Sequence, residues 1–281
     1  MRELKLTQIW IYPIKSLGGI ALSHSRVMKK GLELDRRWML VDQDGVFITQ
    51  RVHTILALFK LSIEPDHLVV NYNGDTIFVP LNRRGGHAPV QVQIWDDNVT
   101  AGEVDERLSI WFSERLGIIC RLVQFPEENP RQIDPEYSRP GEYVSLADSF
   151  PFLIVGDASL HNLNTRLDNP ITMKRFRPNL VFSGGEPFEE DTWKEFTIGE
   201  SSFQGVKPSS RCVLTTVDPE TGNKGAEPLK TLAKFRRWNN KIYFGQNVVA
   251  CNLTTISVGD KITVHSSLEP NERLLALAPR T

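Results

Sequence analysis

Residues 38–49 read WMLVDQDGVFIT, two short apolar runs on either side of an Asp-Gly pair. Asp-Gly is one of the pairs that adopt the tight turns between antiparallel strands, so this stretch predicts a β-hairpin. The same arrangement recurs in residues 68–79, where apolar runs flank an Asn-Gly pair. Successive hairpins indicate that the first part of the chain is built mainly from strands.

Strands are expected in the rest of the chain too, with two helices between them. The further strand candidates are residues 90–95, 179–183, 193–198, 202–206, 213–217, 242–250 and 261–265. The first helix is predicted after a capping box of Thr100 and Glu103 and ends at Gly117, and the second follows Asp157. The expected fold class is mostly β (α+β), with two β-barrel-like domains and a few packed helices.

The segment at residues 126–140, PEENPRQIDPEYSRP, is rich in proline and charge and poor in apolar residues. Such a composition predicts a linker or a long loop. We therefore expect an N-terminal domain over residues 1–125 and a second domain over residues 126–281. A chain of 281 residues is long enough for two domains that each bury a core.

The overall charge is close to neutral, with 33 Lys and Arg against 34 Asp and Glu. No global field favours a phosphate backbone, so nucleic acid is not expected as a partner. The first ten residues, MRELKLTQIW, carry charges where a signal peptide needs an apolar run, and no stretch approaches the roughly 20 apolar residues that span a bilayer. We expect no membrane partner and a cytoplasmic location.

The three cysteines differ in their neighbours. Cys212 follows the donor-rich residues 207–211, KPSSR, and precedes an apolar run. Nearby cations and hydroxyl groups favour the thiolate, the form that binds soft metals or attacks electrophiles. Cys120 and Cys251 lie in apolar runs, where a cysteine is usually a small buried hydrophobe. A packed, inert thiol is the alternative interpretation of Cys212.

Basic residues stand beside turn formers in three places: at Lys15-Ser16, at Arg36 and in residues 174–179, KRFRPN. Arginine binds phosphate through two parallel hydrogen bonds, and lysine adds a point charge, so such positions suit an anionic ligand. Each cluster by itself is equally explained as a set of solvated turn residues. An anion site follows only if the three clusters converge in space.

Several strings occur together in the order seen in one known family. They are residues 12–16 (YPIKS), 31–38 (GLELDRRW), 147–153 (ADSFPFL), 176–179 (FRPN), 209–219 (SSRCVLTTVDP) and 244–247 (FGQN). On these strings the chain resembles the MOSC proteins that carry an N-terminal MOSC β-barrel domain. That group contains the bacterial YcbX proteins and the mitochondrial amidoxime-reducing component.

The resemblance implies a molybdenum cofactor, in which a pyranopterin dithiolene and one protein cysteine hold the metal. It places Cys212 as the metal ligand and a catalytic residue, and Asp148 as a catalytic neighbour and candidate proton donor. The residues implied to hold the pterin and its phosphate are Lys15, Ser16, Arg36, Ser149, Arg177, Asn179, Ser210 and Arg211. Pyridoxal phosphate binding is a further expectation attached to this family.

The chain also departs from its relatives. YcbX proteins commonly continue into a ferredoxin-like domain with four cysteines for a 2Fe-2S cluster, and this sequence has three cysteines in all. The targeting and membrane segment of the mitochondrial relatives is not found in it either. We therefore expect an external electron-transfer protein, of the ferredoxin, flavodoxin or reductase type, as a partner.

The expected function is a molybdenum-dependent oxidoreductase that reduces N-hydroxylated small molecules, such as hydroxylaminopurines or amidoximes, to amines or amidines. A sulfur-carrier or sulfur-transfer protein that uses a Cys212 persulfide is the alternative, since the same reactive thiolate would serve it. A third reading is a module that binds a phosphate-bearing ligand and catalyses nothing.

Overall fold

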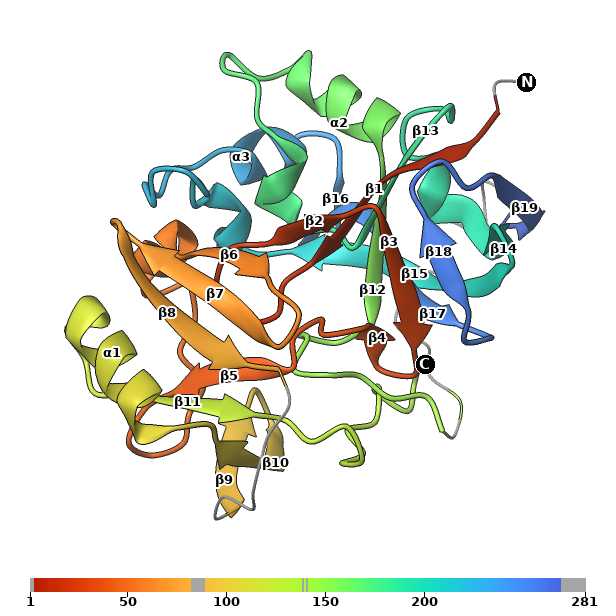
Figure 1. Cartoon of the computed structure of the whole chain (residues 1–281). Helices are drawn as coiled ribbons and strands as arrows, with labels where there is room; N and C mark the ends of the chain where they lie inside the picture. Colours follow the sequence, from red (N-terminus) through yellow and green to blue (C-terminus); the bar gives the residue numbers. More distant parts are fainter. Residues whose placement is uncertain (1–2, 82–88, 138, 140, 269–281) are drawn as a thin grey trace.

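The computed structural model in Figure 1 describes residues 3–81, 89–137, 139 and 141–268. Strands dominate it and helices are few and short, which confirms the expected mostly β class. Four sheets account for the strands, and the largest has nine. Within the described ranges, no helix is both long enough and apolar enough to cross a membrane.

The nine-stranded sheet draws on both ends of the chain. Its order is β19 (Ile262–Ser267), β14 (Trp193–Ile198), β15 (Ser201–Arg211), β17 (Lys241–Ala250), β12 (Phe152–Gly156), β13 (Leu180–Ser183), β1 (Lys5–Ile11) and β2 (Ile20–Leu22), and β16 (Arg237–Trp238) pairs with β17. Neighbouring strands are antiparallel except β12 and β13, which are parallel. Apolar side chains of this sheet, including Leu6, Phe152 and Trp193, form one buried core cluster.

Three smaller sheets complete the fold. One contains β5 (Trp38–Val41), β11 (Arg121–Gln124), β10 (Asp97–Glu103) and β9 (Pro89–Ile94). Another contains β6 (Lys60–Ile63), β7 (His67–Tyr72) and β8 (Asp75–Pro80), and the last contains β18 (Thr255–Ser257), β3 (His24–Met28) and β4 (Gly31–Leu32). A second buried cluster around Trp38, Phe59 and Phe112 fills the space between elements of the first part of the chain.

Both predicted hairpins form. Asn73 and Gly74, between β7 and β8, have φ angles of 51° and 89°, as a type I′ turn requires. In the Asp-Gly hairpin, Gly45 has a φ of 81°, and an isolated bridge joins Val41 to Phe47 after the turn. Both turns therefore form as predicted, but the strand expected at residues 47–49 is reduced to an isolated bridge.

The first predicted helix exists, but its cap differs. The helix α1 (Glu106–Leu116) begins after Asp105, whose side chain accepts a hydrogen bond from the backbone N–H of Arg107. Thr100 and Glu103, the expected capping box, lie in β10 instead. Gly117 ends the helix in the left-handed conformation, as predicted. The second predicted helix is α2 (Asp157–Asn164).

The remaining helical elements are single turns. They are α3 (Leu229–Leu232) and the 3₁₀ turns η1 (Thr54–Leu58), η2 (Met173–Phe176), η3 (Glu189–Thr192) and η4 (Val213–Thr216). The strand expected at residues 213–217 is therefore wrong: β15 ends just before Cys212, and the chain then turns through η4. Thr215 and Thr216 direct their hydroxyl groups back to the carbonyls of Cys212 and Val213 at 3.0 and 2.8 Å, which favours a turn over an extended strand.

The two halves of the chain share strands. β1 pairs with β13, and β3 pairs with β18, so the first 30 residues are joined by hydrogen bonds to the second half (Figure 1). The division at residues 125 and 126 stays a prediction. Because strands from the start of the chain lie among those of the second half, loops from both halves reach the same region.

Candidate active site

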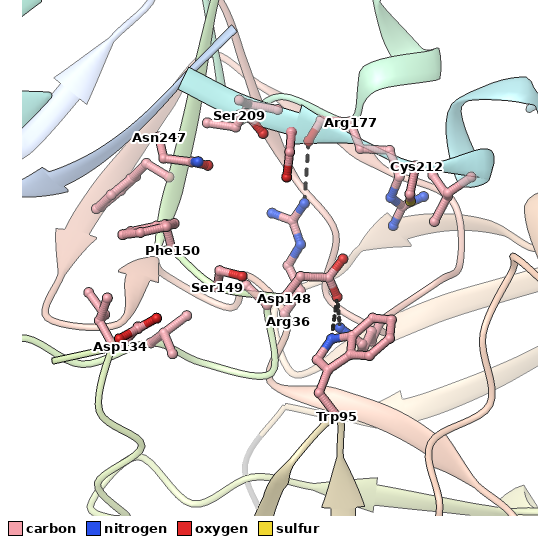
Figure 2. A pocket seen from close by; sticks show the side chains of 18 of the residues that line it. Arg36, Trp95, Asp134, Asp148, Ser149, Phe150, Arg177, Ser209, Cys212 and Asn247 are labelled. Carbon is pink, nitrogen blue, oxygen red and sulfur yellow. Dashed lines mark hydrogen bonds and ion pairs between the residues drawn. The ribbon is translucent and has the colours of Figure 1, made fainter. Parts of the chain in front are cut away.

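One cavity of about 850 Å³ lies where loops of the two halves meet (Figure 2). All ten residues singled out from the sequence line it: Lys15, Ser16, Arg36, Asp148, Ser149, Arg177, Asn179, Ser210, Arg211 and Cys212. The three basic clusters therefore converge in space, as the anion-site argument requires. Their contact with a cofactor stays a prediction.

The backbone around this cavity is strained. Ser16, Arg36, Trp95 and Arg177 all line it and have φ angles of 72°, 50°, 57° and 54°. Non-glycine residues seldom adopt this left-handed conformation, which persists where the surrounding structure enforces it and is frequent at functional sites. Four of the nine described non-glycine residues with positive φ line this cavity, which makes it a candidate functional site.

Two half-buried arginines face the cavity without a carboxylate partner. Arg177 donates to the carbonyl of Leu17 at 2.7 Å, and Arg211 donates to the carbonyl of Phe176 at 2.7 Å. Burial lowers the pKa of each guanidinium to about 10, so both stay charged at neutral pH. Among the described residues neither forms an ion pair, and the Nε of Arg211 is buried without a hydrogen-bond acceptor. An anionic ligand would supply the missing partner.

Tyr12 and Asp35 hold two of the cations in place. The guanidinium carbons of Arg36 and Arg177 lie 4.3 and 4.1 Å from the centroid of the Tyr12 ring. Asp35 pairs with Arg36 at 2.5 Å and accepts a hydrogen bond from the backbone N–H of Tyr12 at 2.7 Å. Burial raises the pKa of Tyr12 to about 12, so it stays neutral. The ring therefore supports two positive charges without neutralising them.

Asn179 performs a structural task. Its side-chain oxygen accepts from the N–H of Leu153 at 3.2 Å, and its side-chain nitrogen donates to the carbonyl of Trp10 at 3.1 Å. These bonds tie β12 to β1 at the rim of the cavity. Ser149 and Ser210, by contrast, are exposed towards the solvent-accessible space and available for a ligand.

Asp148 lies at the centre of the site and is held by three donors. Lys15 Nζ and Arg51 Nη2 contact its two oxygens at 2.5 and 2.8 Å, and the indole N–H of Trp95 donates to it at 3.2 Å. Burial alone would raise the pKa of Asp148, but Lys15 and Arg51 hold it far below its usual range. The side chain is 48% exposed because it faces the cavity. Asp148 is thus an ionised anchor, which argues against its expected role as proton donor.

Lys15 is better suited to carry a proton. Its side chain is 7% exposed, and its Nζ donates to the carbonyl of Leu146 at 2.8 Å as well as to Asp148. Burial lowers the pKa of this ammonium group to about 8, and the carboxylate of Asp148 limits the fall. A group with that pKa exchanges its proton near neutral pH.

Cys212 lies at the end of β15, half-buried, on one side of the cavity. Its sulfur accepts a hydrogen bond from Arg51 Nε at 3.1 Å. Cys120 is buried in a core cluster, as expected. Cys251 is exposed, so its expected burial is wrong: β17 ends at Ala250, and Cys251 follows outside the sheet.

Sequence reasoning missed Arg51, Trp95 and Arg131. Arg51 lies in a turn, TQRVH, that carries no recognisable signal. Arg131 lies in the supposed linker at residues 126–140, and it donates to the carbonyls of Ser145 and Ala147 at 2.8 and 2.6 Å. Residues 131–135 of this segment line the cavity, and Arg131 holds the loop that carries Asp148.

The donor set fits a molybdenum cofactor. Sulfur is the soft ligand that a sulfur-rich metal site prefers, and Cys212 presents its sulfur at the cavity. The guanidinium groups of Arg177 and Arg211, which line the cavity and form no ion pair among the described residues, suit the phosphate or the polar edge of a pterin. The fold and site thus define a mostly β protein whose cavity, with basic groups and one cysteine sulfur, suits an anionic cofactor with a sulfur ligand.

Two protein families match this sequence. The MOSC N-terminal beta barrel domain matches residues 3–118, and the MOSC domain matches residues 141–263. The human mitochondrial amidoxime-reducing component 1 is 34% identical over 276 residues, which cover 92% of this chain and 82% of that protein. The rat mitochondrial amidoxime reducing component 2 is 32% identical, covering 92% of this chain and 82% of that protein.

The chain therefore belongs to the MOSC-domain family that includes the mitochondrial amidoxime-reducing components. A molybdenum cofactor sulfurase from rice is 28% identical over 93% of this chain, but the match covers only 34% of that protein. The expected cytoplasmic location is wrong, because the relatives at 32–34% identity are named as mitochondrial proteins.

Proposed function

We propose that this protein is a molybdenum-cofactor oxidoreductase that reduces N-hydroxylated small molecules, such as amidoximes or hydroxylaminopurines, to amidines or amines. The observation that carries the proposal is the thiol of Cys212 at a cavity lined by Lys15, Arg36, Arg177 and Arg211. The names of the relatives, amidoxime-reducing components, support the reaction.

The bound cofactor would supply the redox step, in which the N–O bond breaks and two electrons and two protons convert the oxygen to water. The chain's own residues perform three tasks around it. Cys212 provides the protein ligand. Arg36, Arg177 and Arg211 bind the anionic part of the cofactor, and Ser16, Ser149 and Ser210 add hydroxyl groups at the same wall.

Lys15 and Asp148 have different roles in proton transfer. Lys15, with a pKa near 8, can deliver a proton to the departing oxygen at neutral pH and recover it from water. Asp148 accepts hydrogen bonds from Lys15, Arg51 and Trp95, so it orients these groups and stays ionised. Residues 131–135 form part of the cavity wall.

We also propose that electrons come from a separate electron-transfer protein. The printed sequence contains no glycine-rich dinucleotide fingerprint, and its three cysteines are too few for a four-cysteine cluster. The cofactor-loaded protein should reduce an amidoxime with reduced viologen, or with NADH plus a ferredoxin or flavodoxin and its reductase. It should fail with NADH alone. Turnover by the pure protein with NADH as the only reductant would contradict this part of the proposal.

The sulfur-carrier alternative predicts a different composition. A persulfide on Cys212 would give protein with cyanide-labile sulfur and without molybdenum, whereas the reductase should contain molybdenum and pterin. Pyridoxal phosphate was also expected at first. Of the three lysines that line the cavity, Lys15 is paired with Asp148 and Lys207 lies over the Tyr137 ring, and nothing favours an imine at Lys241, so our proposal is limited to the molybdenum cofactor.

A further inference from the structure

The side chain of Arg51 reaches the metal-binding cysteine from the other half of the chain. Its Nε donates to Cys212 Sγ at 3.1 Å, and its Nη2 donates to Asp148 at 2.8 Å. The guanidinium also lies 4.3 Å from the centroid of the Trp95 ring and is 17% exposed. The carbonyl of Arg51 accepts a hydrogen bond from Lys224 Nζ at 3.3 Å. The guanidinium is thus held by the sulfur, the carboxylate and the ring, and the backbone of Arg51 is held by Lys224.

Trp95 supports that geometry under strain. It follows Ile94 in the two-residue turn between β9 and β10, where Ile94 pairs with Asp97. Its φ of 57° lies in the region that glycine and asparagine prefer, and a bulky aromatic residue there is an outlier. The ring stacks on Arg51, and its N–H donates to the same carboxylate as Arg51 does. Backbone strain of this kind is frequent at positions where the side chain has a function.

We propose that Arg51 is a positioning residue that fixes the sulfur of Cys212 and withdraws negative charge from it, and so sets the reduction potential of the metal bound there. This inference rests on the proposed function. Hydrogen bonds to ligating sulfur atoms are among the factors by which a protein sets the potential of a metal site. A guanidinium is suited to the task because it stays charged and holds a fixed planar geometry.

The sign of the effect follows from charge. Each added electron increases the negative charge at the metal and its ligands, and a nearby cation that donates a hydrogen bond to sulfur stabilises that more negative state. Arg51 should therefore raise the reduction potential. Replacing it with a neutral residue should lower the potential, and replacing it with lysine, which keeps the charge but not the Nε–H geometry, should lower it less.

The test compares Arg51→Gln and Arg51→Lys with wild type and with Arg115→Gln. Arg115 is a close match far from the cavity lining: it lies 4.3 Å from the centroid of the Trp111 ring, pairs with Asp75 at 2.8 Å and is 19% exposed. Each protein is produced in a host that makes the cofactor. Molybdenum content, the thermal unfolding midpoint and the midpoint potential of the one-electron Mo(VI)/Mo(V) couple are measured, the last by electron paramagnetic resonance titration.

We expect wild type and Arg115→Gln to have the same midpoint potential. The midpoint potential of Arg51→Gln should be lower by at least about 59 mV, which corresponds to a tenfold change in the equilibrium constant of the one-electron couple. Cofactor-free Arg115→Gln, from a host that cannot make the cofactor, is the reference for the stability of empty variants. Loss of molybdenum from an Arg51 variant that unfolds with cofactor-free Arg115→Gln would also support the positioning of the sulfur. Loaded Arg51 variants with the wild-type potential would overturn the inference. So would an empty variant that unfolds below cofactor-free Arg115→Gln, since Arg51 would then be a structural residue. A wild-type protein without molybdenum would instead count against the proposed function.

Discussion

Arg51 Nε and Cys212 Sγ lie 3.1 Å apart, although 160 residues separate them in the sequence. The bond joins a turn of the first half to the end of β15 in the second. Asp148 accepts from the same guanidinium, so the cysteine, the arginine and the carboxylate form one connected unit. The two halves therefore build the site together, and neither would complete it alone.

Arg177 and Arg211 should control how tightly the protein retains the cofactor. Replacing Arg177 or Arg211 with methionine removes a charged donor from the anion site while keeping most of the side-chain volume. Hydrogen bonds to charged groups contribute about 1.5 to 3 kcal/mol, so cofactor affinity should fall about tenfold or more. The measurement is the pterin content of each variant after extended dialysis.

Arg166→Met is the matched control for these variants. Arg166 lies 4.4 Å from the centroid of the Phe235 ring, much as Arg177 lies over Tyr12, but it is exposed and does not line the cavity. Its loss should leave retention unchanged. Equal pterin content in Arg177→Met, Arg211→Met and Arg166→Met would show that Arg177 and Arg211 do not bind the cofactor.

Glu190 should make stability depend on pH. Its carboxyl is buried, and it accepts hydrogen bonds from the N–H of Gly156 at 3.1 Å and from Ser159 Oγ at 2.9 Å. Burial, followed by the charge of Asp191, raises its pKa from 4.5 to about 7. The unfolded chain therefore releases this proton at lower pH than the folded chain does, and the folded state loses stability as pH rises from about 4.5 to 7.

The variant Glu190→Gln has no such proton. Its free energy of unfolding relative to wild type should increase between about pH 4.5 and 7 and stay level outside that window, as followed by urea unfolding. Parallel pH profiles for the two proteins would show that Glu190 does not titrate in this way.

The two cysteines outside the cavity should respond differently to substitution. Cys120 is buried and packs in the cluster around Phe112, so Cys120→Ser places a hydroxyl in an apolar core and should cost about 1 to 3 kcal/mol of unfolding free energy. Cys251 is exposed, and Cys251→Ser should change stability by less than about 0.5 kcal/mol. Urea unfolding midpoints measure both. A larger loss for Cys251→Ser than for Cys120→Ser would contradict the burial of these two side chains.

The sequence predicted those parts of the fold that depend on local chemistry. Asn73-Gly74 specifies its turn because both residues tolerate positive φ, and Gly117 ends α1 for the same reason. The predicted strand after Cys212 failed because threonine favours strands in general, whereas Thr215 and Thr216 here bond to their own backbone and form a turn. The choice between these states is made by hydrogen bonds that no pattern of apolar residues reveals.

The site was predicted in part, for a similar reason. Basic residues beside turn formers pointed to Lys15, Arg36 and Arg177, the donor-rich residues 207–211 pointed to Cys212, and family resemblance supplied Asp148. Arg51 could not be found, because its role depends on long-range packing and its own turn resembles any polar loop. The cytoplasmic location was wrong because charge balance and the lack of a long apolar run describe the chain and do not specify a compartment.

The central claim is that Cys212 holds molybdenum in the cavity between the two halves. The direct measurement is the molybdenum and pterin content of wild type, Cys212→Ser, Cys120→Ser and Cys251→Ser, each purified from a host that makes the cofactor. Protein from a host that cannot make the cofactor serves as the blank. We predict near-stoichiometric molybdenum in wild type and in the Cys120 and Cys251 variants, and none retained in Cys212→Ser. Equal molybdenum in all four proteins, or none in wild type, would contradict the account.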